Sequence, residues 1–249
     1  MKKIIGNFKM NKTNSEIKEY IMNFVSKVDK SRAEIILCLP STALSTAKYL
    51  LDGSGIAIGA ENLCDEEGGK NTGEVSGEML KDCGAEYVII GHSERRVKYR
   101  ENNRSINKKI KIALKNRIKV IFCIGESLAE KNLMKTAEVL KTQLEDALKG
   151  LYENELENIV IAYEPVWAIG TGKIPMNKDI EDAVKTIRKV IADDFSNKAA
   201  EKIEVVYGGS VDNKNCGSIS KIKSINGLLV GGACLDPINF CQLIRDTKA

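Results

Sequence analysis

Residues 158–163 read NIVIAY, a run of apolar residues that is closed at once by Glu164 and Pro165. The run is continuously apolar rather than alternating, which is typical of a strand covered on both faces, as in a parallel sheet with helices outside. Reacting groups in α/β barrels follow the carboxyl ends of such strands. The stretch therefore predicts a buried parallel strand that ends in a candidate functional carboxylate.

Seven further short runs have a similar β-rich character. With the first, they occupy residues 3–8, 34–39, 56–60, 87–91, 119–124, 158–163, 203–207 and 227–230. Strand followed by helix, eight times in 249 residues, fits a (β/α)8 barrel with a parallel eight-stranded barrel and outer helices. No linker or composition break is visible, so we expect residues 1–249 to form one domain. A doubly wound open sheet is the alternative, which eight units disfavour.

The segments between these runs have the apolar spacing of helices. Helices are predicted over residues 15–30, from Ser76, over 128–150, over 178–195 and from Asp236, where Asp caps the helix and Pro237 opens it. Between Ser93 and Lys119 the chain carries eleven Lys or Arg residues and two acidic ones. We interpret this run as the solvated face of outer helices, and a nucleic-acid surface is the alternative.

Composition excludes several classes of protein. With 43% hydrophobic and 29% charged residues the chain is an ordinary globular one, and its apolar runs are far shorter than the ~20 residues of a membrane span. A net charge of +4 does not by itself imply a nucleic-acid partner. The first residues, MKKIIGNFKMNK, lack the apolar core of a signal peptide. Seven scattered cysteines without a C-x-x-C pair predict reduced thiols in a cytoplasmic protein, with no metal site.

Polar side chains of types that can take part in catalysis or binding follow three of the expected strands. Asn7 and Lys9 follow the first, His92, the only histidine, follows the fourth, and Glu164 follows the sixth. A carboxylate after a buried strand is suited to take a proton from carbon, and a strand-end lysine is suited to contact an anion. The alternatives are a packed histidine, a structurally paired carboxylate and a surface ammonium group.

Glycine pairs follow the last two expected strands. Backbone N–H groups of glycine loops approach anions closely, and this end of a barrel often binds phosphate. Two tight turns are the alternative. The pairs are Gly208-Gly209, followed by Ser210, and Gly231-Gly232.

The loop after Glu164 carries apolar residues between polar flanks. It holds the only tryptophan, Trp167, with Gly170 and Gly172 beyond it, a composition that favours a lid over a ligand. An ordinary loop with a packed Trp is the alternative. The spacings of a P-loop and of a dinucleotide fingerprint are absent from the sequence, which argues against a dinucleotide cofactor.

Several of these segments together resemble the triosephosphate isomerase family. The likeness extends from residue 2 to about 245. The segments are GNFKMN at 6–11, IGHSERR at 90–96, AYEPVWAIGTGK at 162–173, YGGSV at 207–211 and GGA at 231–233.

The resemblance implies a cytoplasmic isomerase of glycolysis and gluconeogenesis that works without cofactor or metal. It would interconvert dihydroxyacetone phosphate and D-glyceraldehyde 3-phosphate through an enediolate. Glu164 would be the base and His92 the neutral electrophile, with Lys9 stabilising negative charge. Asn7 would help to hold the substrate, and Glu94 would lie near His92 without contacting the substrate itself. The substrate-binding residues implied are Asn7, Lys9, Gly170, Ser210, Gly231 and Gly232.

The resemblance also implies a homodimer, with a small phosphorylated triose as ligand and neither nucleic acid nor membrane as partner. In it the loop over residues 69–74 would carry Thr72 toward the active site of the partner subunit. Four departures from the family pattern are Phe8 for Trp, Asn71 for an aromatic residue, Lys173-Ile174-Pro175 for Lys-Thr-Ala, and Glu61 for Gln.

Two other functions compete with the isomerase. One is another phosphosugar enzyme that uses the same glycine loops, against which the motifs around His92 and Glu164 argue. The other is a non-catalytic scaffold that retains the fold, against which the intact polar set argues.

Overall fold

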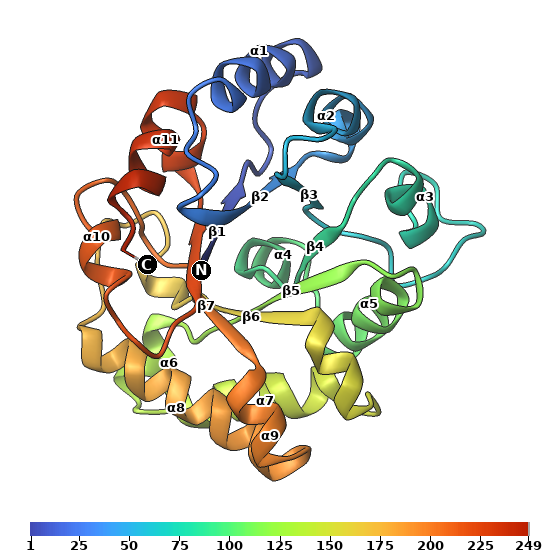
Figure 1. Cartoon of the computed structure of the whole chain (residues 1–249). Coiled ribbons are helices and arrows are strands. Elements are labelled where there is room, and N and C mark those ends of the chain that lie inside the picture. The colour runs from blue at the N-terminus through green and yellow to red at the C-terminus, as the bar shows by residue number, and fades with distance from the viewer. Residues whose placement is uncertain (249) are drawn as a thin grey trace.

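The computed structural model describes residues 1–248, which form a closed barrel of parallel strands in the order β1 to β8, with β1 paired to β8 (Figure 1). Each strand is followed by helical structure on the outside of the barrel, so the predicted (β/α)8 fold is confirmed. The strands are β1 (Lys2–Asn7), β2 (Ala33–Leu39), β3 (Ala57–Ala60), β4 (Tyr87–Ile90), β5 (Lys119–Ile124), β6 (Ile159–Tyr163), β7 (Glu204–Tyr207) and β8 (Gly227–Val230).

The outer layer is made of α-helices, several of them short. They are α1 (Asn14–Val25), α2 (Leu44–Leu51), α3 (Gly77–Asp82), α4 (Ser93–Lys98), α5 (Asn103–Lys115), α6 (Leu128–Asn132), α7 (Thr136–Leu148), α8 (Asn177–Asp194), α9 (Asn197–Lys202), α10 (Cys216–Ile219) and α11 (Pro237–Asp246). Four 3-10 turns complete the chain: η1 (Ser41–Ala43), η2 (Glu153–Asn158), η3 (Val166–Ala168) and η4 (Gly232–Cys234).

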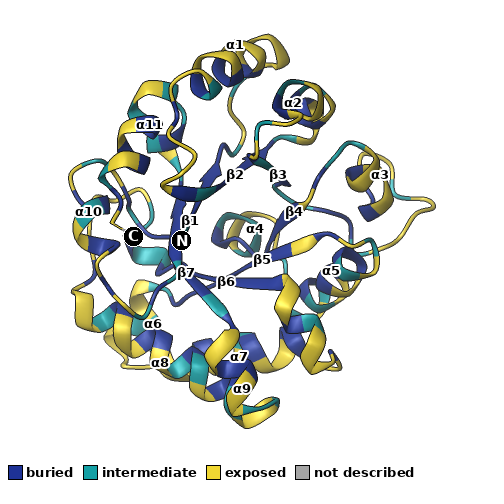
Figure 2. Ribbon diagram, viewed as in Figure 1, coloured by how far each residue is buried: buried dark blue, intermediate teal, exposed yellow. Residues whose placement is uncertain are grey.

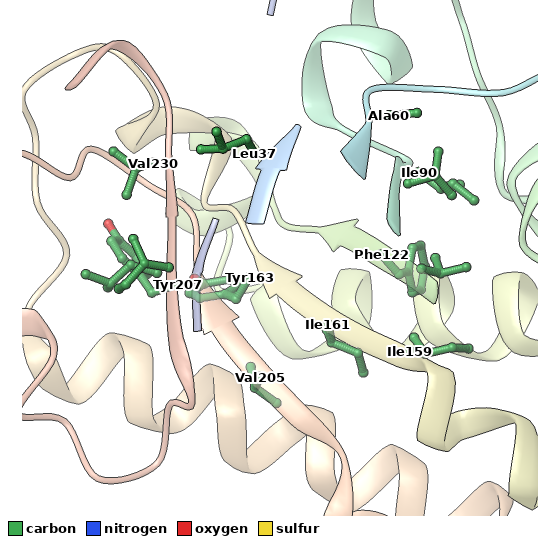
Figure 3. Packing of buried hydrophobic residues seen from close by; sticks show 14 of the residues in the cluster. Leu37, Ala60, Ile90, Phe122, Ile159, Ile161, Tyr163, Val205, Tyr207 and Val230 are labelled. Atoms are coloured by element: carbon green, nitrogen blue, oxygen red, sulfur yellow. The ribbon is translucent and has the colours of Figure 1, made fainter. Parts of the chain in front are cut away.

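Both faces of the strands are covered, which is why their sequences are continuously apolar. Alternate residues point outward and pack against the helices, among them Phe122, Ile161, Val205 and Val230 (Figure 3). The strands are buried while the outer helix faces are exposed (Figure 2). The other residues fill the barrel interior: Ile5, Ile36, Cys38, Tyr87, Ile89, Ile121, Cys123, Val160, Ala162, Val206 and Leu229.

The amino-terminal end of the barrel is closed by an ion-pair cluster. The Lys3 ammonium lies 2.7 Å from a carboxylate oxygen of Glu34 and 2.7 Å from one of Glu204. Tyr87 donates a hydrogen bond of 2.8 Å to Glu34. A ligand therefore has to enter the barrel from the other end, at the carboxyl ends of the strands.

One predicted helix, over residues 128–150, is wrong as a single element. The structure divides it into α6 and α7, because Met134 has a left-handed backbone with φ of 55° that no continuous helix allows. The predicted helix over 15–30 is shorter, and ends at Val25. Its start is set by a capping box between Thr13 and Glu16.

The basic run between Ser93 and Lys119 is mostly the outer face of α4 and α5, with Ile106 and Ile110 turned inward. Arg95 and Arg96 are partly buried, and Lys109 is buried, with its ammonium in contact with Asn62 and Glu101 at 2.8 and 2.5 Å. Within residues 1–248 no helix has both the length and the apolar character that crossing a bilayer requires.

Candidate active site

A cavity of about 230 Å³ opens at the carboxyl ends of the strands. It is lined by side chains and loops that are far apart in sequence: Asn7, Lys9, His92, Glu164, Ile169, Gly170, Gly208, Gly209, Ser210, Val211, Asp212, Leu229, Gly231, Gly232 and Ala233. A larger groove of about 540 Å³ lies between η2 and α9, but Lys202 and Glu157 there pair with each other at 3.1 Å. The smaller cavity is therefore the candidate site, and it unites eight of the nine predicted site residues.

Two of the predicted site residues, His92 and Glu164, are in contact in this cavity. Nε2 of His92, just beyond β4, is 3.3 Å from Oε1 of Glu164, just beyond β6. Both residues are buried, with 5% and 2% exposure. The second carboxylate oxygen of Glu164 has no hydrogen-bond partner in residues 1–248, which leaves it free to accept a proton.

The tautomer of His92 is set by α4. The backbone N–H of Glu94 donates to Nδ1 of His92 at 3.2 Å, so this nitrogen acts as an acceptor. A neutral imidazole whose Nδ1 accepts must carry its proton on Nε2. The ring therefore presents an N–H donor toward the cavity and toward Glu164.

Glu164 is fixed by two glycines that have no room for a side chain. A Cβ atom on Gly125 would lie 1.9 Å from the carbonyl oxygen of Glu164, and one on Gly208 would lie 2.8 Å from its Cγ. The backbone N–H of Glu164 also donates to the Ile124 carbonyl at 2.7 Å. The carboxylate is thus held from β5 and from the loop after β7.

Lys9 lines the same cavity and approaches the glycine loop after β8. Its ammonium is 3.9 Å from the position that a Cβ atom on Gly231 would take. The same ammonium forms an ion pair of 2.7 Å with Glu94. Glu94 is the one predicted site residue that does not line the cavity; it contacts Lys9 and, through its backbone, His92.

Lys9 and Asn7 are positioned by a local turn at the end of β1. The backbone N–H of Lys9 donates to the side-chain oxygen of Asn7 at 3.1 Å, and Lys9 has a left-handed backbone with φ of 52°. A lysine in this conformation is strained, which is typical of functional positions.

The start of the loop after Glu164 is held by Glu126, a residue that was not predicted from the sequence. Glu126, 1% exposed, accepts hydrogen bonds from Trp167 Nε1 at 2.8 Å and from Tyr163 at 3.1 Å. The Lys131 ammonium lies 3.8 Å from the Trp167 ring. Glu126 stands just after β5, so the rule that located Glu164 would also have located it.

Residues 170–174 of this loop are exposed, and the loop bends at two glycines. Gly170 and Gly172 have φ of 66° and 73°. Only Ile169 and Gly170 of this segment line the cavity. The loop is placed at the rim of the cavity, with glycine bends that can absorb a change of conformation.

The loop over residues 69–74 lies away from the cavity, and Thr72 is exposed. In the loop after β1, Met10 is 97% exposed, which is unusual for a large apolar side chain. Among residues 1–248 no cluster of three His, Cys, Asp or Glu side chains is arranged to hold a metal ion.

Glu61 follows β3 and is largely buried. Burial raises the pKa of its carboxyl to about 8, the backbone of Lys9 opposes this, and the charge of Glu94 adds to it. Glu61 forms no ion pair within the described chain, and the nearby Arg95 contacts Glu101 instead at 2.5 Å. One oxygen of Glu61 has no hydrogen-bond partner among these residues.

Comparison with known proteins gives a consistent result along the whole chain. The family model described as triosephosphate isomerase matches residues 2–247. The triosephosphate isomerase of Alkaliphilus metalliredigens is 42% identical over 242 residues, covering 97% of this chain and 98% of that protein. The one from Dictyoglomus turgidum is 43% identical over 244 residues, with 97% and 98% covered. A crystal structure of triosephosphate isomerase from Bartonella henselae has a TM-score of 0.88 and 34% identity, and covers 98% of each chain.

Proposed function

The chain belongs to the triosephosphate isomerase family and is an isomerase, and from this premise we propose that its barrel cavity interconverts dihydroxyacetone phosphate and D-glyceraldehyde 3-phosphate, a step of glycolysis and gluconeogenesis. The observation that supports this site most strongly is the His92–Glu164 pair at 3.3 Å beside the Lys9 ammonium and two glycine loops. One base, one donor and one cation are what an enediolate reaction needs.

The chemistry follows from the placement of these groups. Glu164 takes the proton from the carbon next to the carbonyl of dihydroxyacetone phosphate, and the electron pair moves to the carbonyl oxygen. Nε2–H of His92 donates to that oxygen, and the Lys9 charge stabilises the enediolate. His92 then passes a proton from the hydroxyl oxygen of the deprotonated carbon to the former carbonyl oxygen. Return of the proton from Glu164 to the former carbonyl carbon leaves the aldehyde on its neighbour, so atoms and electrons balance within the substrate.

The phosphate would be held by the loops after β7 and β8, with Ser210, Gly231 and Gly232 as contacts and Gly170 from the lid. Gly232 is exposed and a Cβ atom on it would meet nothing within 4 Å, so there is open space beside this loop for an anion. Closure of the lid would exclude water from the enediolate and limit loss of phosphate.

An assay with two substrates tests this function. Purified protein with dihydroxyacetone phosphate and a coupled readout of glyceraldehyde 3-phosphate should give rapid turnover. Dihydroxyacetone without the phosphate should be turned over far more slowly, because the glycine loops then have no anion to bind. Absence of turnover on the phosphorylated triose, with a folded protein, would refute the proposal.

Lys9→Met is expected to weaken both substrate binding and turnover. Loss of a charge-assisted contact of ~1.5–3 kcal/mol corresponds to roughly 10- to 100-fold in kcat/KM. Steady-state kinetics check this, with Lys12→Met as the matched control because Lys12 does not line the cavity. Normal KM and kcat in the Lys9 variant would exclude its role at the anion.

We also propose that the chain acts as a homodimer through the loop around Thr72. Large apolar side chains that are exposed in the single chain support a second copy as the partner: Met10, Val97 and Tyr99 are 97%, 71% and 65% exposed. Sedimentation should give twice the chain mass of 27.4 kDa, and Thr72→Arg should lower it toward one chain. A fully active monomer at micromolar concentration would contradict this.

A cytoplasmic location is proposed as well. All seven cysteines are free and six are buried. Such a set is compatible with a reducing compartment.

A further inference from the structure

Behind the loop that carries His92, a guanidinium group is held mainly by backbone carbonyls. Arg96 on α4 donates to the Gly91 carbonyl at 2.8 Å, to the Cys123 carbonyl at 3.3 Å and to the side chain of Asn103 at 2.7 Å. Burial lowers the pKa of this guanidinium from its ordinary value. Its neighbour Arg95 differs, since it forms an ion pair with Glu101.

These contacts continue the sheet where its own pairing ends. The ladder between β4 and β5 ends at Ile90 and Phe122. Gly91 and Cys123 are the next residues along the chain after this last pair, and their carbonyls both accept from Arg96. The guanidinium thus links β4 to β5 just beyond the last residues that backbone pairing links.

Gly91 is shaped to admit this group. Its φ is 76°, a left-handed conformation that favours glycine, and a Cβ atom there would lie 3.1 Å from Nη2 of Arg96. The same Cβ would lie 3.1 Å from the Cys123 carbonyl. A side chain at position 91 would therefore crowd the guanidinium.

The two joined strand ends lead to the two reacting residues. His92 follows Gly91 directly. Beyond Cys123, the Ile124 carbonyl accepts from the backbone N–H of Glu164 at 2.7 Å. The separation of His92 and Glu164 therefore depends on how β4 is held against β5.

We infer that Arg96 is a positioning residue for the isomerase reaction: its three hydrogen bonds fix the end of β4 against the end of β5 and so hold His92 in register with Glu164. This rests on the proposed function. Arg96 touches no cavity-lining side chain that we assign to substrate, so it acts on the reaction only through His92 and Glu164. Its planar fork reaches three acceptors, which a lysine ammonium cannot match in geometry.

The chain offers a matched control. Arg188 on α8 also donates to backbone carbonyls, those of Ala200 and Glu201, and burial lowers its pKa in the same way. It lies beside α9, away from the cavity. Arg188→Met should therefore cost stability as Arg96→Met does, without touching the reacting pair.

The test compares Arg96→Met, Arg96→Lys and Arg188→Met with the wild type, by steady-state kinetics, thermal melting and NMR of the imidazole. The His92 signals need no assignment, because the chain has one histidine. A misplacement of about 1 Å at reacting groups costs up to ~10²-fold, so Arg96→Met should lower kcat by roughly 10- to 100-fold with KM within about 3-fold. Its imidazole signals should move.

The other variants separate positioning from stability. Arg96→Lys keeps one or two contacts and should recover part of kcat; it also serves as the main variant if Arg96→Met does not fold. Arg188→Met should melt earlier with kcat within about 2-fold of wild type and unmoved imidazole signals. The inference is overturned if Arg96 and Arg188 variants lose kcat equally, if the loss is confined to KM, or if the His92 signals stay in place. An inactive wild type would refute the proposed function, while the imidazole signals would still report on Arg96.

Discussion

Glu164→Gln is expected to reduce turnover by about 10²- to 10⁴-fold, the usual cost of losing a general base. The amide has nearly the shape of the carboxylate but cannot accept the proton. Since Gly125 and Gly208 fix the backbone and Cγ of residue 164, the variant should keep its fold. The unpartnered carboxylate oxygen is the atom that the substitution removes from the chemistry.

Three measurements make this result specific. Steady-state kinetics give kcat, thermal melting shows whether the fold is retained, and calorimetry with inorganic phosphate shows whether the glycine loops still bind an anion. Glu78→Gln on the exposed face of α3 is the matched control and should behave as wild type. Turnover of the Glu164 variant within a few-fold of wild type would remove the base assignment.

Glu61→Gln is expected to stabilise the protein at neutral and alkaline pH. Burial of the Glu61 carboxyl raises its pKa in the folded chain to about 8, against an ordinary value of 4.5. Between these values the folded state binds a proton that the unfolded state has lost, so stability falls as pH rises through this window. At pH 7 the difference corresponds to about 3 kcal/mol per chain before relaxation of the structure.

The pH dependence distinguishes this cause from a simple packing effect. At pH 4 both states hold the proton and the substitution should bring little gain; at pH 7 and 8 the melting temperature should rise by several degrees. Turnover should change little, because Glu61 does not line the cavity. An equal shift at pH 4, 6 and 8, or a loss of stability at pH 8, would contradict the buried-acid account.

The barrel could be predicted from sequence because strands buried on both faces are continuously apolar. The candidate site could be located for a related reason: reading the residue after each strand finds His92 and Glu164, which the fold then brings to 3.3 Å. That distance itself depends on contacts between β4, β5 and β6, which no local pattern shows.

Other features depend on partners that are distant or on single dihedral angles. The helix over 128–150 has helical apolar spacing throughout, and only the left-handed Met134 divides it. Lys109 resembles its solvated neighbours in sequence, but the carboxylate of Glu101 and the amide of Asn62 hold it in the interior. The burial of Glu61 follows from the packing of the β3 end, not from its neighbours in sequence.

The most direct test of the central claim, that Glu164 carries a proton between two carbons of a triose phosphate, is turnover of dihydroxyacetone phosphate in D₂O followed by proton NMR. A carboxylic acid exchanges its proton readily, so the glyceraldehyde 3-phosphate formed should contain solvent deuterium at C2. Glu164→Gln should form little product on the same time scale. Product formed at the wild-type rate by the variant, or wild-type product free of deuterium at C2, would contradict the account.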